Sequence, residues 1–176
     1  MLKLPQAGET VTVQLFKKPK REAFVDSSGE ERLPTDEEWA EAMAEYEEKK
    51  DCKLVVRRLE PSQSEEYHYE FDDINAAEEL RVYQLRQQYD AEQRPAVHRE
   101  SFVTHEAVTA RREWAHRVLR AGVEGMEGAL IGRAQKAAEE ATSEEIVNGL
   151  MLGNIYIVAA NRVLMAQHLT VDESFC

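Results

Sequence analysis

The chain has 176 residues, enough for one hydrophobic core, and its 43% of apolar residues is higher than intrinsically disordered chains carry. Its net charge of −12 resides in residues 30–79, where 18 acidic residues outnumber 6 basic ones, so direct nucleic-acid binding is disfavoured. No stretch reaches the roughly 18 apolar residues of a membrane span, the first residues lack a signal peptide's apolar core, and the two cysteines lie far apart, so we expect a cytoplasmic protein.

The first residues predict a strand hairpin. Residues 10–16 alternate apolar with polar side chains, which is the period of a strand with one buried face. A basic turn at 17–21 then leads to a second short strand at 22–25, which turn-forming residues end. The basic run is interpreted as a lysine-rich turn rather than as a nuclear-localisation signal.

A helix is predicted from about residue 36 to residue 50. Thr35 can cap it, and Glu37 and Glu38 oppose the positive end of its dipole. The apolar positions recur at intervals of three and four and form one stripe: Trp39, Ala42, Met43 and Tyr46.

Two further strands are predicted after this helix. Residues 52–59 are short and β-branched in the middle, and residues 67–71 alternate aromatic with polar side chains. The fold class expected is α+β, with a β-rich first portion, residues 1–72, of about four strands and one helix. A mostly helical portion, residues 73–176, is expected to pack with it as one unit.

Three helices are predicted in the second portion. One runs from about residue 73 towards Pro95, and one follows Thr104 with an apolar stripe. That stripe consists of Ala107, Ala110, Trp114, Val118 and Ala121. The last, over residues 143–169, is apolar almost all round at its centre, which is typical of a helix buried by several neighbours or by another subunit.

Glycine placement suggests an association surface. Six of the eight glycines fall in two predicted helices, where each costs about 1 kcal/mol relative to alanine. They line smooth faces that would admit another helix closely, within the chain or between copies; alternatively, residues 122–128 form a flexible break. The candidate interface residues are Gly122, Gly125, Gly128, Gly132, Gly149, Gly153, Ile155 and Val158.

No cofactor, metal or catalytic motif is predicted. His105 and Glu106 begin like a zinc-protease helix, but position 109 is Thr, where the second histidine ligand would stand. An enzyme assembled from scattered residues would draw on His105, Glu106, Arg112 and His116. Boundary packing at the flank of a helix explains these residues without chemistry.

One resemblance points to a functional class. The segment at residues 32–39, followed by the segment at residues 53–59, resembles small, poorly characterised proteins encoded among prophage virion genes, over about residues 30–80. The resemblance implies a role in virion structure or tail assembly.

The preferred hypothesis is a non-enzymatic structural or assembly protein that binds other protein subunits and forms homo-oligomers. The alternative is an acidic regulator or DNA mimic that occupies the nucleic-acid site of a basic protein. A small enzyme ranks third.

Overall fold

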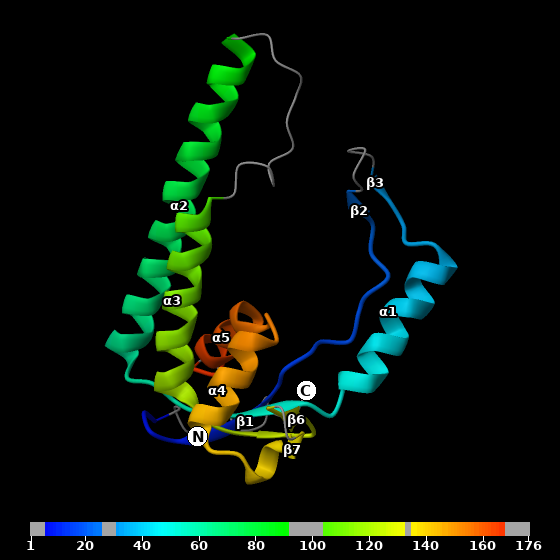
Figure 1. Cartoon of the computed structure of the whole chain (residues 1–176), viewed down its shortest axis with the longest axis vertical. Coiled ribbons are helices and arrows are strands. Elements are labelled where there is room, and N and C mark those ends of the chain that lie inside the picture. Colours follow the sequence, from blue (N-terminus) through cyan, green and yellow to red (C-terminus); the bar gives the residue numbers. More distant parts are fainter. Residues whose placement is uncertain (1–5, 26–30, 92–103, 133–134, 168–176) are drawn as a thin grey trace, which may run out of the picture.

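The computed structural model describes residues 6–25, 31–91, 104–132 and 135–167, and its architecture is α+β (Figure 1). Short strands and one helix precede a predominantly helical part, which confirms the fold class. The elements are β1 Thr10–Gln14, β2 Phe24–Val25, β3 Glu31–Arg32, α1 Asp36–Lys49, β4 Lys53–Arg57, α2 Pro61–Ala91, α3 His105–Gly122, β5 Val123–Glu127, β6 Leu130–Ile131, β7 Lys136–Ala137, the 3₁₀ turn η2 Ala138–Glu140, α4 Ser143–Leu152 and α5 Tyr156–Met165.

A three-stranded antiparallel sheet of order β1-β4-β5 organises the core. The alternation predicted for β1 is confirmed, because Val11, Val13 and Leu15 are buried. The predicted hairpin of residues 10–16 with residues 22–25 is wrong: β1 pairs with β4, and β2 pairs with β3. The reason is apolar content, since β4 buries Leu54 and Val56 whereas the residues before β2 are exposed and polar.

Three helices, α3, α4 and α5, cover one face of this sheet (Figure 1). Their buried side chains form one cluster with those of the strands. Trp114 and Val118 of the stripe predicted for α3 are fully buried, as expected from its helical spacing. The side chains with the largest buried volume on these helices are Trp114, Leu119, Ile146, Leu150 and Leu164.

Helix α2 replaces the predicted strand at residues 67–71, which is therefore wrong. Tyr67 and Phe71 stand four residues apart and both face α3, where the Phe71 and Trp114 rings stack with centroids 4.3 Å apart. The Trp114 Nε1 group donates to the Tyr67 carbonyl at 2.9 Å, whereas Tyr69 is exposed. The expected boundary at residue 72 thus falls inside one continuous helix.

The single helix predicted over residues 143–169 is also wrong, because α4 and α5 are separate. Gly153 caps the end of α4, and Asn154 has a φ of 57°, which a right-handed helix does not accommodate. The chain therefore turns at this point, and α5 packs on α3 rather than extending α4. Residues 168 and 169 of the predicted helix lie outside the described residues.

Helix α1 confirms its predicted start. The Thr35 side chain accepts from the Glu38 amide while the Glu38 carboxylate accepts from the Thr35 amide, which is a complete capping box. The helix stands apart from the α2–α5 group, on the opposite side of the molecule from α2 (Figure 1). Within the described chain none of its residues is buried, so its predicted stripe is covered only in part.

Candidate functional site

An apolar groove of about 790 Å³ lies between α4 and the β6–β7 hairpin, and it extends to the end of β1. Ile131, Leu150 and Ile155 contribute apolar lining, and Phe16 lies at one side. Two leucines that also line the groove are largely exposed, Leu130 at 65% and Leu152 at 83%. Large apolar side chains gathered around a hollow are typical of a surface that binds another molecule.

A glycine allows the hairpin to approach α4. A Cβ at Gly149 would lie 2.9 Å from the Ile131 Cγ2 atom, closer than a methyl group tolerates. The Ser143 hydroxyl donates to the Glu124 carbonyl at 2.9 Å and fixes the start of α4 against β5. These contacts hold α4 beside the β6–β7 hairpin and β5.

Polar groups at the start of α4 bind the β6–β7 hairpin at the edge of the groove. Thr142 and Glu145 form a second capping box, and Lys136 of β7 donates to the Glu145 carboxylate at 3.1 Å. Hydrogen bonding from the Thr142 backbone, and next from Lys136, lowers the pKa of Glu145. Glu145 is therefore ionised at neutral pH and ties the hairpin to the helix.

The groove's one cysteine does not supply a nucleophile. The Cys52 thiol is buried and donates to the Gly128 carbonyl at 3.2 Å. Burial is the main cause that raises the pKa of Cys52, and the nearby Asp51 charge is the second. A thiol that stays protonated at neutral pH serves packing rather than covalent chemistry.

Four of the predicted interface residues come together in this groove: Gly132, Gly149, Gly153 and Ile155. Gly132 lies after β6 with a φ of 77°, Gly149 faces Ile131, and Gly153 and Ile155 form the α4–α5 junction. Half of the predicted set therefore lies at one surface. These residues line a groove instead of forming a glycine-lined helix face.

The other four predicted residues lie elsewhere. Gly122 ends α3 against Val163, Gly125 lies in β5 beside Val55, and Gly128 lies against the Asp51 backbone with a φ of 69°. The helix predicted to carry these glycines and the alternative of a flexible break at residues 122–128 are both wrong, because the chain pairs with β4 directly after Gly122. Val158 of α5 is 44% exposed and is not part of the groove lining.

Leu130 and Leu152 are groove residues that the sequence analysis missed. The helix predicted over residues 143–169 includes Leu152, although the following Gly153-Asn154 pair is a helix-end signal. A helix that ends there leaves its last side chain free to point outward. Nothing in the sequence pattern marks Leu130 as exposed.

The chain matches no protein-family model, no curated protein and no solved structure.

The candidate catalytic residues do not form a site. His105, Glu106 and Arg112 are exposed, His116 is half-buried, and the Glu106 carboxylate pairs with Arg81 at 3.6 Å. The eleven residues between His105 and His116 correspond to about 16 Å of helix, too far for both to act on one reacting atom. In the described ranges no group of three His, Cys, Asp or Glu side chains could hold a metal ion.

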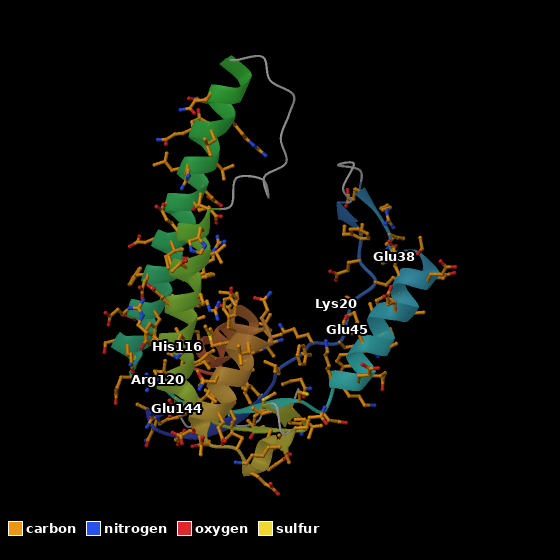
Figure 2. All side chains as sticks on the ribbon, viewed as in Figure 1. Lys20, Glu38, Glu45, His116, Arg120 and Glu144 are labelled. Atoms are coloured by element: carbon orange, nitrogen blue, oxygen red, sulfur yellow. The ribbon has the colours of Figure 1, made fainter. Side chains whose placement is uncertain are left out.

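The acidic segment does not present a single face. Figure 2 shows Glu38 and Glu45 on α1, whereas the other helical residues of the segment belong to α2, on the opposite side of the molecule. Several carboxylates of the segment also pair with bases: Glu38 with Arg32, Glu45 with Lys49, Glu70 with Arg117 and Glu78 with Arg111. A DNA mimic requires unpaired carboxylates along one exposed face, so this arrangement does not favour mimicry.

None of the described helices combines the length and apolar character that a bilayer span requires.

Proposed function

We propose that this chain is a non-enzymatic structural or assembly protein that acts through protein contacts, with the apolar groove between α4 and the β6–β7 hairpin as its association surface. The observation that carries the proposal is the exposure of Leu130 and Leu152 around a hollow beside which hydrogen bonds join α4 to β7 and to β5. Burying apolar surface stabilises association by about 25 cal/mol per Å².

The partners proposed are other protein subunits, including further copies of this chain. The resemblance of residues 30–80 to prophage virion proteins gives the proposal its specific form, a component of virion structure or tail assembly. We infer that it works in the cytoplasm, or in the virion if it is phage-encoded.

Light scattering of the full chain tests the proposal. We expect the wild-type protein to show a mass that rises with concentration above its monomer mass of 20.2 kDa, and Leu152→Glu to remain at 20.2 kDa. The matched control is Leu80→Glu, which makes the same change at an exposed leucine of α2 outside the groove and should associate like the wild type. A wild-type protein that stays monomeric, or an L152E variant that associates normally, would refute the proposal.

A further inference from the structure

Helix α2 carries apolar side chains on two opposite sides. Tyr67 and Phe71 lie on the inner side, which packs against α3, and α2 forms the outer edge of the molecule (Figure 1). On the outer side Tyr69, Leu80 and Tyr83 are exposed at 69%, 59% and 60%. A surface helix normally presents polar residues to water on this side. The outer side of α2 is therefore an apolar surface that the described part of the chain does not cover.

The exposed side chains have the spacing of a coiled-coil seam. Tyr69, Ala76 and Tyr83 follow each other at intervals of seven residues, and Leu80 lies four residues after Ala76. Ala76 is exposed as well. An apolar repeat that averages 3.5 residues packs along one other helix. Because the seam from Tyr69 to Tyr83 is about 21 Å long, its occupant would be a helix of about four turns.

An acidic residue within the seam defines the charge of the occupant. Asp73 stands four residues after Tyr69 and three before Ala76, so it lies on the same side of α2. It is exposed, and it forms no ion pair within the described part of the chain. A helix on the seam would remove this carboxylate from water, which is costly unless a cation pairs with it. The occupant must therefore supply a lysine or an arginine opposite Asp73.

A hollow beside Tyr69 has room for such a basic side chain. It measures about 540 Å³, and besides Tyr69 it is lined by four acidic residues: Glu65, Glu66, Glu70 and Asp73. Glu70 pairs with Arg117, whereas the other three form no ion pair among the residues that the structure describes. Carboxylates beside an exposed tyrosine ring attract a lysine or arginine side chain by charge and by cation–π contact. The charge of the hollow therefore complements a basic partner.

The α2 helix of a second copy does not meet this requirement. Two parallel α2 helices in register would place Asp73 opposite Asp73. Two antiparallel helices aligned on Ala76 would bring Tyr69 to Tyr83, but they would place Asp73 opposite Glu79. The first basic residue of α2 after Pro61, apart from a histidine, is Arg81, which pairs with Glu106 at 3.6 Å. Like charges at the centre of the seam therefore disfavour pairing of α2 with itself.

We propose that the outer side of α2 binds an amphipathic helix of a different protein, one with an apolar seam flanked by lysine or arginine. Its apolar residues would cover Tyr69, Leu80 and Tyr83, and one of its basic residues would pair with Asp73 at the hollow. This contact lies outside the groove, and its partner is not a copy of this chain. Its failure would therefore leave the proposed function of the groove untouched.

Binding of two synthetic peptides to the full chain tests the inference by fluorescence anisotropy. Both peptides are helical and about three heptads long with leucine at the seam positions, and one carries lysine and the other glutamate at the flanking positions. We expect only the lysine peptide to bind the wild type. Leu80→Ser and Tyr83→Ser should each raise its Kd by at least about tenfold, because each removes a large apolar contact. The matched control is Leu130→Ser, the same change at an exposed leucine of the groove, which should leave the Kd unchanged.

A second pair of variants separates a specific contact from general attraction to an acidic protein. Asp73→Asn should weaken binding of the lysine peptide more than Glu37→Gln, which removes an exposed carboxylate of α1. All of the substituted side chains are exposed, so each variant should keep the circular dichroism spectrum of the wild type. The inference is wrong if the lysine peptide does not bind, if it binds L80S and Y83S as tightly as the wild type, or if L130S abolishes binding. Equal binding of the glutamate peptide, or equal effects of D73N and E37Q, would also overturn it.

Discussion

At the scale of single residues, glycines decide how closely elements approach. A Cβ at Gly122 would overlap the Val163 Cγ1 atom of α5, and one at Gly149 would press on Ile131. These two positions explain why glycine is tolerated near or within helices despite its cost in conformational entropy. The close helix packing expected from the glycines occurs within this chain at Gly122, where α3 meets α5.

The variant Gly122→Ala should lower the free energy of unfolding by about 1–3 kcal/mol, because the added methyl group overpacks the α3–α5 contact. Urea denaturation would measure this change. Val163→Ala in the same chain should recover part of the loss, since it removes the atoms that collide. A G122A protein as stable as the wild type would show that α3 and α5 do not pack in this way.

Glu38 should titrate at unusually low pH. Its carboxylate accepts two hydrogen bonds from Arg32, at 2.7 and 2.8 Å, and one from the Thr35 amide, and these lower its pKa from 4.5 to about 2. Since the folded-state pKa is the lower one, ionised Glu38 stabilises the start of α1 above pH 4.5, and this contribution is lost as the pH falls towards 2.

NMR titration of the Glu38 carboxyl carbon would measure this pKa. Arg32→Gln removes the largest cause of the shift and should raise the titration midpoint towards 4.5. A wild-type midpoint already near 4.5 would mean that the Arg32–Glu38 pair does not form in solution.

The histidines of α3 should prove dispensable. Because His105 is exposed and His116 is only half-buried, replacing both by Gln should change the free energy of unfolding by less than about 1–2 kcal/mol and leave association unchanged. Thermal denaturation and light scattering would measure the two effects. A folded double variant that had lost its function would instead favour the enzyme hypothesis.

At the scale of elements, α2 and α3 form a pair whose contact centres on Trp114. The indole ring stacks on Phe71 and donates to the Tyr67 carbonyl, and Arg111 and Glu78 form an ion pair further along. Trp114→Ala should therefore lower the free energy of unfolding by about 3–5 kcal/mol. Tyr69→Ala, at an exposed ring on α2, should change it by less than about 0.5 kcal/mol. Equal effects of the two variants in denaturant titrations would contradict this account of the helix pair.

Elements with local signals could be predicted from the sequence. Thr35 and Thr104 mark the starts of α1 and α3, and the period of two marks β1, because caps and alternation act between neighbouring residues. Residues 67–71 could not be resolved in this way, since Tyr67 and Phe71 fit both a strand face and a helix face. Packing on Trp114 selects the helix.

Much of the candidate site depends on contacts distant in sequence. Four of the predicted interface residues line the groove, but its hollow arises because β5 pairs with β4 and the β6–β7 hairpin then folds against α4. Strand pairing between residues about 70 positions apart leaves no local pattern, so the glycines from Gly122 to Gly132 fit a helix face or a flexible break equally well in the sequence. The exposure of Leu152 follows from the α4–α5 break, which Gly153 and Asn154 do signal.

At the scale of the whole molecule, the groove between α4 and the β6–β7 hairpin is an open apolar surface. The hydrophobic core lies between the sheet of β1, β4 and β5 and the three helices that cover it, and its side chains are buried. Exposed apolar residues around a hollow indicate association with another chain. We propose that this association occurs at the groove.

Amide hydrogen exchange at two protein concentrations tests that claim most directly. In the associated protein we expect the amides of β6 and α4 to exchange more slowly than in the diluted monomer, while those in the first half of α2 exchange at the same rate in both samples. Leu152→Glu should remove the difference. An associated protein whose β6 and α4 amides exchange as fast as in the monomer, with new protection elsewhere, would contradict the account.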